Sequence, residues 1–361
     1  MPRSSRPSLV HFAALLAVCA ALLGVAADSR AADDKQKFRL AWTIYVGWMP
    51  WDYAEESGIL KKWADKYGIE IDAVQLNDYV ESINQFTAGA FDACVMTNMD
   101  ALTIPAAGGV DSTALIVGDF SNGNDGIILK GKSNLVDIKG QNVNLVELSV
   151  SHYLLARALD SIGASERDLK VINTSDADIV AASAAEDTTA IVTWNPQLSE
   201  ILKSPGMHRV FDSSQIPGEI IDLTVVNSKT LAANPAFGKA LAGAWYEVMA
   251  LMARDDDAGR AVRSALGKAS GTDLTGYDAQ LATTRMFYNA AEAVTFTRSA
   301  ELAATMRKVA EFSFAHGLLG EGAPGAEYIG IETAAGTVGD PGNVKLRFEP
   351  AYMQMAADGK L

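Results

Sequence analysis

The apolar residues of this chain fall into short runs that alternate with stretches of helical spacing. The runs with the length and composition of strands are 38–42, 69–75, 91–97 and 112–117. The helical patterns between them cover 53–63, 79–88 and 101–107. Strands separated by helices of this length form parallel β-α-β units, so the pattern predicts an α/β fold.

A turn-rich stretch, Gly118–Gly126, separates this series from a second one. The second series has strand-like runs at 126–129, 142–146, 169–173, 189–193 and 208–211, with helical patterns at 151–162, 176–184 and 196–202. Ile220–Val226 is again strand-like and is predicted to return the chain to the first unit. We therefore expect two lobes joined by two crossings, with residues 32–120 and 226–361 in lobe 1 and 121–225 in lobe 2.

Long helical patterns follow the predicted return. Asn234-Pro235 is a helix start, and apolar residues then recur at helical spacing from Phe237 to Met252. Leu302, Met306 and Val309 repeat this pattern. We interpret both stripes as core that packs on lobe 1, in preference to a cofactor site. The glycine-rich tail after Gly320 is predicted to form a short hairpin or to lie extended.

The N-terminal segment has the features of a secretory signal peptide. Arg3 and Arg6 precede an apolar run at 9–25, and Ser29-Arg30-Ala31 has the small-x-small pattern of a cleavage site. A membrane anchor is the alternative, but the run is short for one. We expect residues 1–31 to be removed and the mature protein to reside in the periplasm.

Charge and cysteine content narrow the function further. The 361 residues carry a net charge of −14, spread along the chain, which argues against nucleic acid as a partner. Cys94 is the single cysteine after the predicted cleavage, so no internal disulfide is expected. His152, His208 and His316 lack ligand spacing. We therefore predict no metal and no cofactor.

The candidate binding residues follow the predicted strands, because open α/β sheets bind ligands at the carboxyl ends of their strands. They are Tyr45, Trp48, Asn98, Asp100, Asp119, Glu147, Ser149, Ser151, His152, Trp194 and Asp222. Structural roles stay open as alternatives to ligand binding: Asn98 and Asp100 are also suitable helix caps, and His152 is a suitable packed helix residue. The helix start near Ser149 and Ser151 would favour an anion.

Three segments resemble the solute-binding proteins of the nitrate, taurine and aliphatic-sulfonate ABC importers. They are 89–93 (GAFDA), 148–155 (LSVSHYLL) and 192–196 (VTWNP). The resemblance covers about Phe38 to Met252. It implies a two-lobed periplasmic-binding-protein fold of type II-like topology, a monomer that captures a small-molecule solute, and an ABC permease with its ATPase subunits as partners.

A narrower resemblance concerns the ligand. Trp42–Asp100 and Phe120–Asp125 are similar to the branch of this family found beside urea carboxylase and guanidine carboxylase, which implies guanidine or urea. The candidate strand ends carry four acids and no Arg or Lys, which favours a planar cation that bonds to carboxylates and stacks on aromatic rings. A sulfonate-type anion remains the alternative.

Two other classes of protein share this architecture. A pyrimidine synthase of thiamine biosynthesis has similar lobes, but it is cytoplasmic and has a cysteine-rich run. We therefore predict no catalytic residues and no enzymatic activity. A ligand-sensing module for a receptor would look identical in sequence, so the choice between an importer and a receptor as partner stays open.

Overall fold

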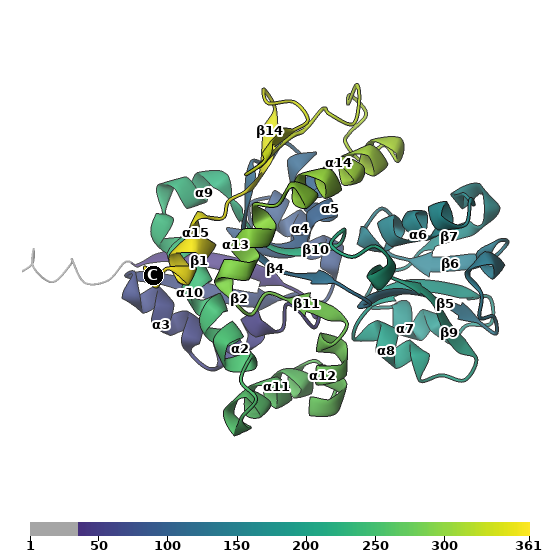
Figure 1. Cartoon of the computed structure of the whole chain (residues 1–361), viewed down its shortest axis with the longest axis horizontal. Helices are drawn as coiled ribbons and strands as arrows, with labels where there is room; N and C mark the ends of the chain where they lie inside the picture. The colour runs from purple at the N-terminus through teal and green to yellow at the C-terminus, as the bar shows by residue number, and fades with distance from the viewer. Residues whose placement is uncertain (1–34) are drawn as a thin grey trace, which may run out of the picture. The chain divides into compact units, whose positions relative to one another are not determined.

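Two β-sheets organise the part of the chain that the computed structural model describes, residues 35–361 (Figure 1). The larger sheet has nine strands: β1 (Gln36–Trp42), β2 (Ile69–Gln75), β3 (Ala93–Thr97), β4 (Ser112–Ser121), β10 (Ile221–Asn227), β11 (Thr284–Met286), β12 (Gly330–Thr333), β13 (Gly336–Val338) and β14 (Val344–Phe348). The smaller sheet has five: β5 (Asp125–Lys130), β6 (Asn142–Leu145), β7 (Lys170–Asn173), β8 (Ala190–Trp194) and β9 (Met207–Asp212). The predicted α/β class is confirmed. The predicted signal peptide lies outside the described residues.

Helices accompany both sheets. Those that follow strands of the first series are α2 (Pro50–Glu56), α3 (Ile59–Lys66), α4 (Tyr79–Thr87) and α5 (Asn98–Ala101), and those beside the smaller sheet are α6 (Val150–Ser161), α7 (Ile179–Ser183) and α8 (Gln197–Leu202). The C-terminal helices are α9 (Ser228–Ala233), α10 (Pro235–Met252), α11 (Asp257–Ala269), α12 (Leu274–Leu281), α13 (Ala290–Thr297), α14 (Ala300–Ala315) and α15 (Ala351–Ala357). Among the described residues, no helix has both the length and the apolar character needed to cross a bilayer.

The first crossing is shorter than the sequence predicts. Strand β4 continues through Gly118 to Ser121, because residues 119–121 still pair with β10 and β11. Only residues 122–124 separate β4 from β5, so these three residues of Gly118–Gly126 form the turn and the others belong to the two strands.

The return crossing precedes the position that the sequence predicts. The chain passes back between β9 and β10, over residues 213–220. Residues 221–225, which the sequence analysis assigns to lobe 2, instead pair with β3 and β4 in the larger sheet. Their alternating apolar character reflects a central strand rather than a hinge. The other lobe boundaries stay predictions.

The C-terminal helices pack on lobe 1, as predicted. Helix α10 buries Phe237 against Phe38 in a stacked pair with 4.4 Å between ring centroids, and Trp245 lies 5.2 Å from Trp51. A Cβ atom on Gly118 would lie 2.9 Å from the Trp245 ring, so this glycine lets the helix approach β4 closely. The tail after Gly320 forms the hairpin β12–β13 and adds β14 beside β4, which extends the larger sheet.

Candidate functional site

Four buried aromatic side chains from both lobes meet at one point. Tyr45 and Trp48 lie in the turn after β1, Tyr79 begins α4, and Trp194 ends β8 of the smaller sheet. The ring centroids are 4.8 Å apart for Tyr45 and Trp48, 5.5 Å for Trp48 and Tyr79, and 5.6 Å for Tyr79 and Trp194. These rings line a cavity of about 10 Å³, which has room for roughly one water-sized molecule.

Carboxyl groups close the same cavity. Asp222, at the start of β10, and Asp125, at the start of β5, both line it and are each 3% exposed. Asp119 lies directly opposite Asp222 in the antiparallel pairing of β4 and β10, and its Oδ1 accepts a hydrogen bond of 3.2 Å from the hydroxyl of Tyr45. The remaining residues that line the cavity are Thr97, Val150 and Ile220. No basic side chain is among the lining residues.

Burial makes these carboxyl groups weak acids. It raises the pKa of Asp119 to about 7 and that of Asp125 to about 7, and with the nearby charge of Asp119 it raises the pKa of Asp222 well above its usual value. Within the described residues, Oδ2 of Asp119 and Oδ2 of Asp222 have no hydrogen-bond partner. A buried acceptor without a donor costs about 1–3 kcal/mol. The two facing carboxyl groups therefore either share a proton or take a donor from a bound molecule.

A fourth buried acid, Asp100, lies near Asp119, Asp125 and Asp222. Asp100 accepts hydrogen bonds from the hydroxyls of Tyr79 (2.6 Å) and Thr97 (2.8 Å), and burial raises its pKa to about 6. The backbone N–H of Val150, at the start of α6, favours the charged form of Asp100 and offsets part of this shift. The helix start that the sequence analysis considers for an anion thus already faces a carboxylate of the protein.

Gly47 allows the close contact between Tyr45 and Asp119. A Cβ atom at this position would lie 2.5 Å from Oδ2 of Asp119 and 2.5 Å from Cε1 of Tyr45. Both neighbours are buried and cannot move without disturbing the cavity.

We expect Gly47→Ala to weaken solute binding about tenfold to hundredfold, because overpacking of this kind costs about 1–3 kcal/mol. Gly322→Ala is the matched control, since a Cβ atom there meets nothing within 4 Å. Calorimetric titration measures the affinities and circular dichroism checks the fold. Equal affinities of the two variants would show that the Gly47 contact does not shape the site.

The structure brings some of the sequence-predicted residues together and leaves others apart. Tyr45, Trp48, Asp100, Asp119, Trp194 and Asp222 lie in or next to the cavity. Asn98 instead accepts a hydrogen bond from the backbone of Ile221, and Ser149 caps α6 by accepting one from the backbone of Ser151. Glu147 is exposed, and His152 is packed beside Glu166. Ser151 is buried next to the lining residue Val150, and its hydroxyl has no hydrogen-bond partner among the described residues. A ligand role for Asn98, Glu147, Ser149, Ser151 and His152 stays a prediction.

Sequence reasoning missed five residues that line the cavity: Tyr79, Thr97, Asp125, Val150 and Ile220. Asp125 lies at the amino end of its strand, whereas the candidate residues were chosen at the carboxyl ends of strands. Because β5 runs antiparallel to β8, Asp125 is paired with Trp194, which ends β8. Tyr79 follows β2, a strand whose carboxyl end carries none of the candidate residues.

Solved structures show which fold this is. The alkanesulfonate-binding protein SsuA from Xanthomonas axonopodis pv. citri, bound to MOPS, superimposes with a TM-score of 0.64 at 18% identity, over 80% of this chain and 96% of that one. The aliphatic sulphonate-binding protein SsuA from Escherichia coli superimposes with a TM-score of 0.64 at 20% identity, over 80% of this chain and 95% of that one. The nitrate-binding protein NrtA from Synechocystis superimposes with a TM-score of 0.57 at 12% identity, over 91% of this chain and 99% of that one. The chain has the periplasmic-binding-protein fold, as predicted.

The sequence matches to curated proteins cover less of this chain than the structural matches do. A Brucella abortus protein to which a binding function is assigned provisionally is 28% identical over 156 residues, which is 43% of this chain. The match spans 46% of that protein, so this chain covers less than half the length of the curated relatives it matches. No protein-family model matches the chain.

Proposed function

We propose that this protein is the exported solute-binding component of an ABC importer and captures guanidinium between its two lobes. The observation that carries the proposal is the composition of the cavity, where Asp125 and Asp222, with Asp119 behind them, face aromatic rings and no basic side chain lines the wall. A guanidinium ion supplies paired N–H donors to carboxylates and a flat face for stacking. It would satisfy the carboxylate oxygens of Asp119 and Asp222 that have no partner.

The size of the cavity supports a very small solute. The cavity of about 10 Å³ would have to widen for any organic solute, and guanidinium or urea, with four heavy atoms each, would need the least widening. A sulfonate that carries a carbon chain would need the lobes to separate further. The SsuA structures show that this fold also serves larger sulfonates. The difference would then lie in the cavity and not in the architecture.

Charge argues against an anion. An anion at the start of α6 would approach Asp100, whose carboxyl group already faces the backbone N–H of Val150. Desolvated like charges in a buried site repel strongly. Urea stays a second candidate because it has the same planar shape and N–H donors, but it lacks the charge that would compensate the buried acids.

The fold supports a proposal for the partners. Periplasmic-binding proteins of importers deliver solute to a permease that ATPase subunits drive, and we propose the same for this chain, as a monomer in the periplasm. Delivery to a sensory receptor would use the same lobes. The proposal includes no chemical step on the solute.

The test compares solutes on the purified mature protein. We expect calorimetry to show guanidinium binding best, urea more weakly, and taurine and nitrate weakest. Because the cavity is built from both lobes, small-angle scattering should show compaction on binding, and mass spectrometry should recover the solute unchanged. Tight binding of taurine or nitrate would refute the ligand assignment, and turnover of guanidinium would refute the binding-protein assignment.

A further inference from the structure

A second contact between the lobes lies outside the cavity, where α14 meets α6. The ring of Phe312 on α14 packs edge-to-face on Tyr153 of α6, with 5.1 Å between centroids. One turn further along α14, His316 lies 5.3 Å from His152 between ring centroids. Glu166, in the short 3-10 helix Glu166–Asp168 of lobe 2, places one carboxylate oxygen near each imidazole.

The hydrogen bonds of His316 fix its protonation state. Its Nδ1 lies 2.9 Å from the carbonyl oxygen of Phe312, which can only accept, so Nδ1 carries a proton. Its Nε2 lies 2.7 Å from Oε1 of Glu166, and a carboxylate also only accepts. Both nitrogens must therefore donate, and the contact between the lobes is complete only when His316 is the imidazolium cation.

His152 behaves differently. Its Nδ1 accepts a hydrogen bond of 3.1 Å from the backbone N–H of Leu148, so the neutral ring carries its proton on Nε2. That nitrogen lies 3.1 Å from Oε2 of Glu166, off the line of a good hydrogen bond. The two histidines and Glu166 are a donor set that suits zinc, with ligand atoms within 4.8 Å of one another. In this tautomer, however, Nε2 of His152 offers no lone pair to a metal.

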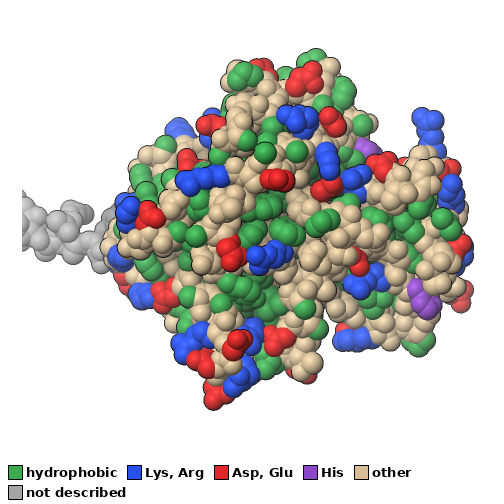
Figure 2. Space-filling view, viewed as in Figure 1, with side chains coloured by type: hydrophobic (Ala, Val, Ile, Leu, Met, Phe, Trp, Pro, Cys, Tyr) green, Lys and Arg blue, Asp and Glu red, His purple; other side chains and the backbone are tan. Residues whose placement is uncertain are grey.

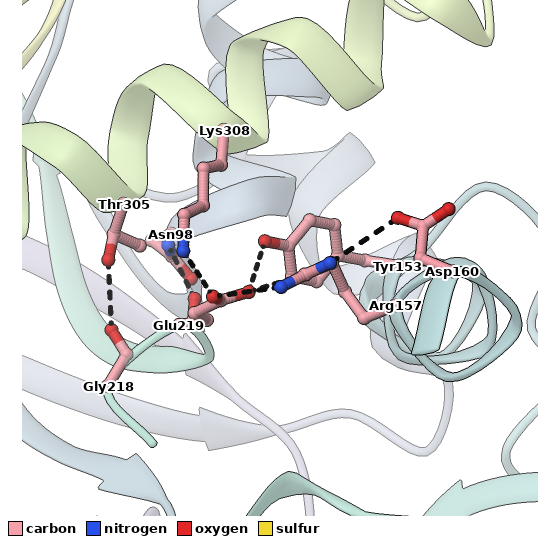
Figure 3. A network of polar contacts seen from close by, with 8 residues as sticks. All are labelled: Asn98, Tyr153, Arg157, Asp160, Gly218, Glu219, Thr305 and Lys308. Carbon is pink, nitrogen blue, oxygen red and sulfur yellow. Dashed lines mark hydrogen bonds and ion pairs between the residues drawn. The ribbon is translucent and has the colours of Figure 1, made fainter. Parts of the chain in front are cut away.

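A neighbouring network holds the same elements together without histidine (Figure 3). Glu219, in the return crossing, accepts hydrogen bonds from Arg157 Nε (2.8 Å) and Tyr153 (2.7 Å) of α6 and from Lys308 of α14 (2.6 Å). Burial raises the pKa of Glu219, but these donors outweigh it and hold the pKa at about 2. This network therefore stays charged at every pH near neutrality, whereas His316 responds to pH.

We propose that His316 and Glu166 form a proton-dependent latch that favours closure of the two lobes. The hydrogen bond to Glu166 is the main reason that the pKa of His316 is raised. The latch is therefore complete below the ordinary histidine pKa of about 6.5 and is lost as the pH rises through the raised value. The other charged groups beside this contact are Arg157, Asp160, Lys308 and Glu311. The latch rests on the proposed clamp but not on the identity of its solute.

The test uses the solute-free protein, because binding of the solute is itself expected to depend on pH. Repulsion between Asp125 and Asp222 at high pH also favours opening, so the contribution of the latch is the difference between the wild type and the variants. Small-angle scattering at pH 5.5 and 8.5 gives the ratio of closed to open molecules. Between pH 5.5 and 8.5 we expect the ratio of closed to open molecules to fall about threefold to tenfold further in the wild type than in His316→Gln, a size typical of a partly exposed charged pair. Glu166→Gln should lose the same part of the pH dependence, and the exposed His208→Gln, as the matched control, should lose none of it. Addition of a chelator should change nothing.

Equal pH dependence in the wild type and in His316→Gln would overturn the latch, whichever solute the cavity binds. Nuclear magnetic resonance provides a second measurement that does not depend on closure. The titration of the His316 imidazole should lie above the ordinary histidine pKa in the wild type and return toward it in Glu166→Gln. An unchanged titration in this variant would also overturn the proposal.

Discussion

Replacement of Asp222 by asparagine should weaken guanidinium binding about tenfold to hundredfold, because a charge-assisted hydrogen bond contributes about 1.5–3 kcal/mol. The same change should stabilise the solute-free protein. Asp222 is buried, lies opposite Asp119 and has a carboxylate oxygen without a partner. At pH 8 the folded protein must either keep Asp222 protonated or bury it as a charge, and asparagine removes this cost, which we expect to be about 1–3 kcal/mol. Calorimetry and thermal unfolding measure the two effects.

The opposite signs of the two effects separate a binding role from a folding defect. Glu147→Gln removes a carboxylate in the same way at an exposed position, so it should change neither affinity nor stability. Asp119→Asn should act like Asp222→Asn, with a further loss because Asp119 orients Tyr45. Urea should lose less affinity than guanidinium in both variants. If Asp222→Asn lowers stability, or leaves guanidinium affinity unchanged, Asp222 does not serve the cation.

The sequence predicted the architecture well because each element carries its own pattern. The apolar run at 91–97 and the spacing from Phe237 to Met252 correspond to β3 and α10 almost to the residue. The crossings were less predictable. Residues 119–121 are polar enough to resemble a turn, yet they extend β4, because β10 and β11 supply hydrogen-bond partners from more than a hundred residues away. Pairing at such a distance leaves no local trace in the sequence.

The candidate site was predicted in part, for a similar reason. Residues at the carboxyl ends of parallel strands, such as Trp194, follow from strand order alone. Asp125 does not, because its position depends on the antiparallel direction of β5 within the smaller sheet. Asp222 was found as a residue of the return segment, although the structure places it at the start of a central antiparallel strand. The direction of a strand decides which of its ends reaches the cavity.

Three ionised carboxylates would carry more negative charge than one guanidinium ion neutralises. Burial reduces this charge, because it keeps some of the carboxyl groups protonated. Asp119, Asp125 and Asp222 converge with no basic side chain among the lining residues, and their raised pKa values mean that some of them hold protons near neutral pH. A protonated carboxyl group also donates a hydrogen bond, so the pair of Asp119 and Asp222 can share one proton while the solute is absent.

Guanidinium binding should therefore release protons, and its affinity should rise with pH. The solute stays a cation throughout, since guanidinium groups have pKa values above about 12. In the solute-free protein, burial raises the pKa of Asp119 and Asp125 to about 7 and that of Asp100 to about 6. A bound cation favours the ionised carboxylates and lowers these pKa values. Affinity should consequently fall as the pH drops below about 7, by about tenfold per pH unit for each proton released.

Calorimetry in two buffers with different ionisation enthalpies measures the released protons directly. We expect more released protons per guanidinium near pH 6.5 than near pH 8.5, because Asp119 and Asp125, with a pKa of about 7, are already ionised at the higher pH. The His316→Gln variant should release slightly more protons, because closure of the wild type takes up protons at His316 and offsets part of the release from the buried acids. Neutral urea should release almost none, since it gives the carboxylates no opposing charge. An affinity for guanidinium that stays constant from pH 5 to 8, with an enthalpy independent of buffer, would mean that the buried acids do not hold the cation.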